Sequence, residues 1–111
     1  MATLRQNKVS RLVQKEMGDI FQKEARHLFV GGLITVTNVE ISPDLSIAKI
    51  FFTVLNLKPQ QTMEMLMEKK PEIRKYLSAR VHSQLRIVPD LRFHIDDSYD
   101  AIQHIEQLLK K

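Results

Sequence analysis

The chain has 111 residues, a length that suits one domain with one buried core. Its hydrophobic fraction of 43% and charged fraction of 27% are typical of soluble globular domains and argue against global disorder. Cysteine is absent, which excludes disulfide scaffolds, zinc ribbons and thiol catalysis.

Neither a membrane segment nor a signal peptide is indicated by the sequence. Its apolar runs are a few residues long, whereas a membrane span needs about 20. Arg5 and Lys8 interrupt any apolar core near the start. We therefore expect a cytoplasmic protein. The 17 Lys and Arg outnumber the 13 Asp and Glu, and this excess becomes informative only if the charges gather on one face.

The first predicted element is a helix over residues 4–28. Its apolar residues recur at steps of three and four, which places them on one side of a helix, and Leu12 falls outside their stripe. Gly31 and Gly32 are predicted to end this helix. The stripe consists of Val9, Val13, Met17, Ile20, Phe21 and Leu28.

The basic residues of the same segment fall opposite the apolar stripe. They lie within roughly 60° of one direction on the helical wheel. This face is either an ordinary solvated surface or an interface for phosphate, and the pattern favours neither. The residues are Arg5, Lys8, Arg11, Lys15, Lys23 and Arg26.

A β-hairpin is predicted next. Residues 33–41 are rich in Thr, Val and Ile, with irregular alternation around Asn38 that indicates a bulge or a strand covered on both sides. Residues 42–45 form a turn in which Asp44 can bond the backbone ahead. Residues 48–54 alternate regularly, with Ala48, Ile50 and Phe52 on one face.

Two helical segments and a third strand follow. Pro59 suits the first position of a helix that carries Met63, Leu66 and Met67. Pro71 indicates a kink or a junction between two helices. The apolar stripe then continues through Ile73, Leu77, Val81 and Leu85, and Leu91, Phe93 and Ile95 form the inward face of the last strand.

Residues 97–111 are predicted to form a short C-terminal helix, begun by Asp97 or Ser98. The whole chain is then one domain over residues 1–111. Its fold class is α+β, with helices packed on one face of a three-stranded sheet.

No group of residues supports catalysis. The histidines are dispersed, and His94 with Asp96 offers too few ligands for a designed metal site. No nucleophile–base pair is evident. We therefore expect no enzyme activity, no metal and no cofactor.

Three segments resemble the ribosome-binding factor A family, and their order and spacing agree over nearly the whole chain. They are residues 11–20 (RLVQKEMGDI), residues 34–50 (ITVTNVEISPDLSIAKI), and residues 85–93 (LRIVPDLRF) followed by residues 96–98. The resemblance implies a type II KH-like domain of order α-β-β-α-kink-α-β. The family's Ala-x-Gly kink aligns with residues 69–71 or lies near Ser78 and Ala79, so its usual residues are absent in the first alignment.

The resemblance also implies a function. Family members bind 16S rRNA in the immature small (30S) ribosomal subunit, support late maturation and rRNA processing, matter in the cold, and are not enzymes. We expect a monomer with no membrane or small-molecule partner. The alternative is a basic module that docks on an acidic protein.

The basic residues are the candidate RNA contacts, because cationic faces attract phosphate backbones through counterion release. Aromatic residues make up only 6% of the chain, so base stacking on exposed rings should be a small term. The candidate residues are Arg5, Lys8, Arg11, Lys15, Lys69, Lys70, Arg74, Lys75, Arg80 and Arg86.

Overall fold

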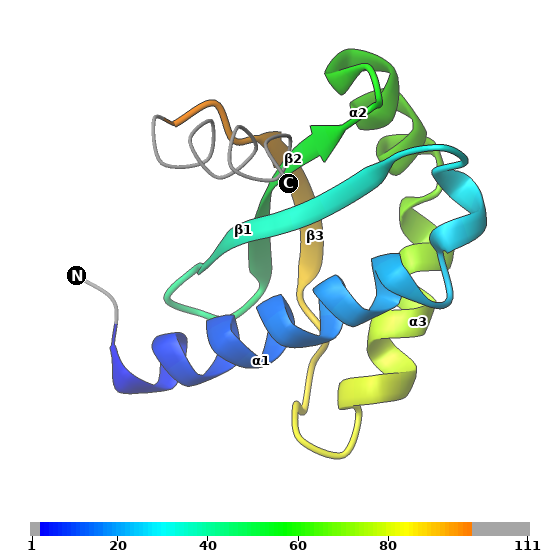
Figure 1. Ribbon diagram of the computed structural model, residues 1–111. Helices are drawn as coiled ribbons and strands as arrows, with labels where there is room; N and C mark the ends of the chain where they lie inside the picture. Colours follow the sequence, from blue (N-terminus) through cyan, green and yellow to red (C-terminus); the bar gives the residue numbers. More distant parts are fainter. Residues whose placement is uncertain (1–2, 99–111) are drawn as a thin grey trace.

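The computed structural model describes residues 3–98, which form a three-stranded sheet with helices packed against it (Figure 1). The predicted C-terminal helix falls largely outside the described residues. In the described part the order is the predicted α-β-β-α-α-β. The elements are α1 (Leu4–Gln22), a 3₁₀ turn η1 (Arg26–Leu28), β1 (Leu33–Ile41), β2 (Ile47–Leu55), α2 (Pro59–Glu68), α3 (Lys70–Val81) and β3 (Asp90–Ile95).

Helix α1 begins with a reciprocal cap. The hydroxyl of Thr3 accepts the backbone N–H of Gln6 at 3.1 Å, and the Gln6 side chain accepts the backbone N–H of Thr3 at 2.8 Å. These bonds satisfy two helix-start donors that would otherwise lack partners. The predicted apolar stripe is buried from Val9 to Phe21, whereas Leu12 is half-buried at its border.

The prediction that the first helix reaches Leu28 was wrong, because α1 ends at Gln22. The N–H of Ala25 donates to the Ile20 carbonyl five residues back, at 2.9 Å, which closes a wide turn. Ala25 and Phe29 are then buried in the core. The chain thus leaves the helix early to bury these two side chains. Gly31, with φ of 81°, belongs to the turn before β1 and does not end the helix.

Strands β1 and β2 form the predicted antiparallel hairpin. Their register shifts between Val36 and Asn38, which confirms the bulge expected near Asn38. The turn between the strands is also as predicted, since Asp44 Oδ1 accepts the backbone N–H of Ser46 at 3.1 Å. Leu45 takes the left-handed conformation in this turn, with φ of 63°.

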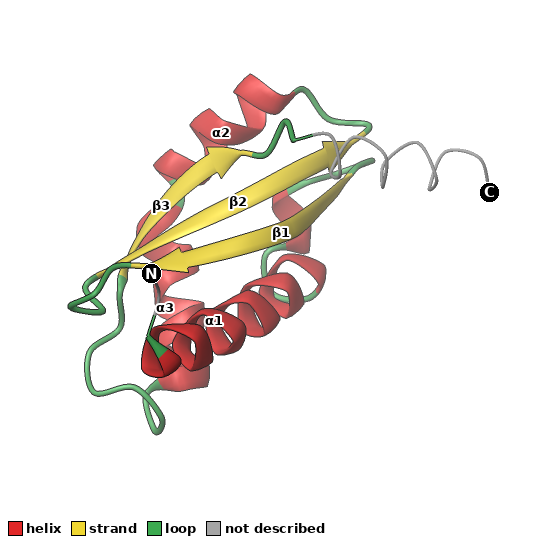
Figure 2. Cartoon of the chain, turned by 90° about the vertical axis from the view of Figure 1, so that its left-hand side faces the viewer, coloured by secondary structure: helices red, strands yellow, loops and turns green. Residues whose placement is uncertain are grey.

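Strand β3 pairs in parallel with β2, so β2 lies in the centre of the sheet. Alternate residues of β2, namely Ala48, Ile50 and Phe52, are fully buried beside Leu91 of β3. Figure 2 shows α1 and α3 together on one side of the sheet. The core therefore lies between this face and the helices, as the strand alternation predicted.

Helices α2 and α3 meet at the predicted junction. Lys69 has left the regular helix (φ −92°, ψ 8°), and Pro71 stands in the first turn of α3, where its missing N–H costs no hydrogen bond. Ser78 and Ala79 lie inside α3, so the alternative position of the kink was wrong.

Two details of the predicted stripes differ from the structure. Met67 was placed on the apolar side of the first of these helices but is 64% exposed. Leu85 was expected to continue the stripe of α3. It lies beyond the end of the helix, where it is half-buried. Ile73, Leu77 and Val81, in contrast, are fully buried.

Candidate nucleic-acid interface

The N-terminal half of α1 carries a row of four exposed cations. Val9, Val13 and Met17 occupy the buried side of the helix, so the basic residues project away from the core. Within residues 3–98, none of the four cations forms an ion pair. We call Arg5, Lys8, Arg11 and Lys15 the basic row.

The orientation of the basic row is fixed by a buried glutamine that sequence reasoning missed. Gln6 is 7% exposed, and its Nε2 donates to the carbonyl oxygen of Ile41 at 2.9 Å. This bond ties the first turn of α1 to the end of β1. The Gln6 side chain also accepts a hydrogen bond from the backbone N–H of Thr3. Its two hydrogen bonds, to Thr3 and to Ile41, together hold the start of α1 in its orientation. The capping spacing of Thr3 and Gln6 was the available sequence signal.

The basic row does not extend to the end of the helix. Lys23 Nζ lies 3.3 Å from Asp19 Oδ1, four residues earlier on α1. Arg26 lies outside α1, in the 3₁₀ turn. Asp19 follows Lys8 by eleven residues, which places it about 20° from Lys8 around the helix. An acid therefore lies on the same face of the helix as the cations.

Arg80 does not face solvent as a phosphate contact would. Its side chain is 19% exposed and reaches from α3 to three carboxylates of the α1 region. Nη1 lies 2.6 Å from Asp19 and 3.2 Å from Glu16, and Nη2 lies 2.9 Å from Glu24. Arg80 therefore joins α3 to α1 as the centre of a cluster of acids.

The cluster stabilises the charged forms of its members. Hydrogen bonds to Glu24 first, and then to Asp19 and Glu16, raise the pKa of Arg80 further above its usual value. In return, the hydrogen bond from Arg80 is the largest cause of the lowered pKa of Asp19. The positive charge of Arg80 is thus already compensated within the fold.

Two further cations of α3 are also engaged. Arg74 donates from Nη2 to the Val88 carbonyl at 2.8 Å and from Nε to the Pro89 carbonyl at 3.3 Å. Lys70 Nζ lies 3.5 Å from Asp90 Oδ1. These contacts hold the start of β3 and the residues before it against α3.

The remaining candidates have more freedom. Lys75 and Arg86 are exposed, and Lys69 is half-buried at the junction of α2 and α3. Arg86 stands in the segment between α3 and β3. Among residues 3–98, none of these three forms an ion pair.

Two other kinds of site are not found in the described part of the chain. Over residues 3–98, no three His, Asp or Glu side chains are grouped in a way that could hold a metal ion. No helix within that range has the length and hydropathy to cross a bilayer.

Comparison with known proteins identifies the family of the chain. The family model described as ribosome-binding factor A matches residues 5–109. The chain belongs to the ribosome-binding factor A family. One relative, the ribosome-binding factor A of Cytophaga hutchinsonii, is 41% identical over 100% of this chain and 84% of its own length.

Solved structures of the family share the fold. The crystal structure of ribosome-binding factor A from Thermus thermophilus superposes with a TM-score of 0.67 at 19% identity, covering 81% of this chain and 94% of the other. A homology model of the Thermus thermophilus factor, fitted into a cryo-EM map of a 30S complex, gives a TM-score of 0.60 at 23% identity, covering 75% and 86%. The fold is thus the α+β, KH-like one of the family.

Proposed function

We propose that the chain is a non-catalytic assembly factor that binds the immature small ribosomal subunit through its 16S rRNA. The observation that carries this proposal is the basic row of α1, four exposed cations without ion pairs among the described residues. Membership in the family supports the choice of partner, as does a structural neighbour named as part of a 30S complex.

Binding would begin with displacement of counterions from the RNA phosphates by the basic row. Each phosphate neutralised makes the logarithm of affinity fall more steeply with the logarithm of salt concentration. Lys69, Lys70, Arg74, Lys75 and Arg86 provide further contacts in this proposal. Arg80 is left out, because a phosphate would have to displace three carboxylates from its guanidinium.

The biological role follows from the partner. The bound factor would support late maturation and rRNA processing, act in the cytoplasm as a monomer, be needed most in the cold, and leave when the subunit matures. Stacking of RNA bases on exposed aromatic rings would contribute little to the affinity, since the chain has no Trp.

A charge-reversed triple variant, Lys8→Glu/Arg11→Glu/Lys15→Glu, tests the proposal. We expect it to keep its fold, because the three side chains are exposed. It should no longer sediment with small subunits, and its salt slope for rRNA should become shallower by roughly 2–3 units. The matched control, Arg26→Glu/Lys49→Glu/Lys58→Glu, reverses three exposed cations elsewhere and should sediment like the unmodified chain.

Two outcomes would contradict the proposal. One is a folded triple variant that still sediments with small subunits. The other is subunit binding by the unmodified chain that is strong while binding to purified rRNA is weak and nearly independent of salt. That second result would favour an acidic protein as the partner.

A further inference from the structure

A pocket lies at the N-terminal end of the basic row. It forms where three segments far apart in the sequence converge: the start of α1, the turn between β1 and β2, and the segment between α3 and β3. Its volume is about 340 Å³, which is at the small end of the range for ligand sites. That size suits one nucleotide and is too small for a helix of a protein partner.

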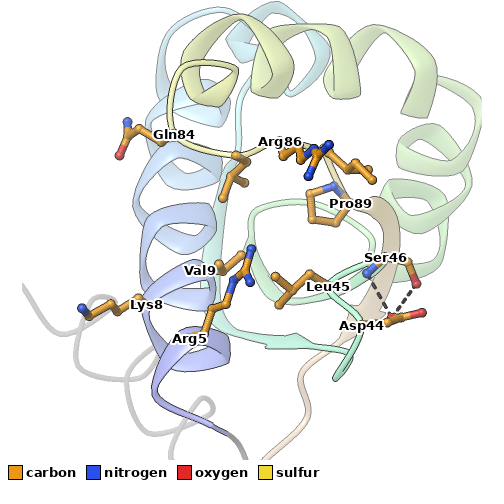
Figure 3. Close-up of a pocket in the computed structure, with 11 residues that line it drawn as sticks. Arg5, Lys8, Val9, Asp44, Leu45, Ser46, Gln84, Arg86 and Pro89 are labelled. Atoms are coloured by element: carbon orange, nitrogen blue, oxygen red, sulfur yellow. Dashed lines mark hydrogen bonds between the residues drawn. The ribbon is translucent and has the colours of Figure 1, made fainter.

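The charges of the pocket are unbalanced. Arg5 from α1 and Arg86 from the segment before β3 both line it, and Figure 3 shows both side chains among the lining residues. Neither forms an ion pair within residues 3–98. Lys8 also lines the pocket, so three cations stand against one acid, Asp44, and the positive potential of the pocket attracts an anion.

The acid that lines the pocket, Asp44, forms no ion pair with these arginines within residues 3–98. Asp44 Oδ1 accepts hydrogen bonds from the Ser42 hydroxyl (2.7 Å), the Ser46 hydroxyl (2.7 Å) and the Ser46 backbone N–H (3.1 Å). These bonds lower the pKa of Asp44 to about 2. The carboxylate therefore stays charged and offsets one of the three cations that line the pocket (Arg5, Lys8 and Arg86), which leaves an excess of positive charge there.

Part of the pocket wall is apolar. Leu45 and Pro89 line it together with Ile87, whose side chain is 71% exposed. Ser46 and Gln84 add hydrogen-bonding groups at the rim. An exposed isoleucine beside two arginines that form no ion pair within the described range fits a ligand that combines a flat apolar face, polar edges and an anionic group. A nucleotide has all three.

We propose that this pocket receives one unpaired nucleotide of the bound RNA, with its base against Ile87 and its phosphate between Arg5 and Arg86. This rests on the proposed function and deepens it. The basic row by itself would hold any RNA backbone, whereas the pocket selects RNA in which a nucleotide has left the helical stack. Arg5 and Lys8 belong to both features, so a strand that follows the row reaches the pocket.

The test compares three RNA hairpins of matched sequence: one fully paired, one with a single-nucleotide bulge, and one with an abasic bulge. Fluorescence anisotropy should show the unmodified chain binding the bulged hairpin about tenfold more tightly than the other two, because a base packed against Ile87 removes apolar surface from water. Ile87→Ser should remove the preference over the abasic bulge, and Arg86→Gln should reduce the preference over the paired hairpin. The control Arg11→Gln, on the basic row but outside the pocket, should weaken binding to all three hairpins alike and keep the preference.

Several results would overturn the pocket proposal while leaving the proposed function intact. Equal binding of all three hairpins by the unmodified chain is one. Equal binding of the base-containing and abasic bulges is another, because the pocket would then bind phosphate alone. A bulge preference that survives both Ile87→Ser and Arg86→Gln would show that the nucleotide binds elsewhere. Competition between an acidic peptide and the hairpin for binding at Arg86 would indicate a protein ligand. Failure to bind any hairpin or rRNA would instead remove the proposed function.

Discussion

Helix α1 and helix α3 each contribute four of the ten cations predicted to contact RNA, yet the structure places the two sets in opposite situations. On α1 all four are exposed and, within residues 3–98, without ion pairs. On α3, Lys70 pairs with Asp90, Arg74 with two carbonyls and Arg80 with three carboxylates. Of the four on α3, only Lys75 lacks such a partner within that range.

The difference follows from where each cation lies relative to the apolar stripe of its helix. Arg80 comes seven residues after the buried Ile73, so the two side chains leave the helix within about 20° of each other. A charge beside a buried stripe needs counter-charges, because desolvation would otherwise be costly. The basic row of α1 lies opposite its stripe and has no such need. Local charge counts alone do not distinguish these cases.

The largest effect is expected from Arg80→Met, which removes the ion-paired guanidinium of α3. The substitution leaves Glu16, Asp19 and Glu24 close together without their shared cation. We expect the free energy of unfolding to fall by about 1–2 kcal/mol, because the cluster is only partly screened by solvent. Thermal unfolding followed by circular dichroism measures this. Affinity for rRNA should stay within about twofold of the unmodified chain.

The control for this variant is Lys75→Met on the same helix, where no ion pair is lost among the described residues. It should leave the unfolding temperature unchanged. If Arg80→Met instead keeps its stability and loses RNA affinity, Arg80 is a phosphate contact after all, and the contrast between the helices fails.

A smaller loss of stability is expected for Arg74→Gln. The side chain would lose its bonds to the carbonyls of Val88 and Pro89, which hold the residues before β3 against α3. Two partly exposed hydrogen bonds are worth about 1 kcal/mol in total. The change should appear in urea unfolding, and hydrogen exchange should increase first at the start of β3. Uniform exchange across the sheet would contradict this assignment.

Much of the fold could be predicted from the sequence because its elements have strong local signals. The period-two alternation of Ala48, Ile50 and Phe52 identified β2 as a strand. Pro59 marked the start of α2, and Pro71 marked a kink or junction that the structure shows to be the junction of α2 and α3. The end of α1 was not predicted because it depends on tertiary packing and not on a local sequence signal. Ala25 is buried in the core, and no local residue pattern predicts this burial.

The candidate site was predictable where it depends on one helix and not where it depends on two. The basic row of α1 follows from helical geometry alone. The Arg80 cluster requires α3 to pack beside the acids of α1, which the sequence does not state. Two signals were available. Arg80 stands at helical spacing from the buried Ile73 on α3, and the acids Glu16 and Asp19 lie one turn apart on α1. The pocket, formed by three distant segments, had no comparable signal.

The α1 side of the contrast can be sharpened with the single substitution Arg11→Gln. Arg11 is exposed on the solvent side of α1, so stability should not change measurably. Loss of one phosphate contact should weaken rRNA binding roughly threefold to fivefold and make the salt slope shallower by about 0.7–0.9. Titrations at several salt concentrations measure both quantities. A loss of affinity without a change in slope would show that Arg11 acts other than by binding phosphate.

The smallest expected effect is the contribution of Asp19 to the pH dependence of stability. Its pKa is lowered from the ordinary value of 3.8, chiefly by the Arg80 hydrogen bond. A carboxyl group with a lowered pKa in the folded state contributes stability above its unfolded pKa, and that contribution is lost as the pH falls through the folded pKa. Asp19→Asn should therefore be less stable than the unmodified chain at pH 7, and the difference should shrink below about pH 4. Urea midpoints measured from pH 7 down to pH 2 follow this. A difference that stays constant over that range would mean that Asp19 acts through hydrogen-bond geometry and not through its charge, because only the charge is removed by protonation.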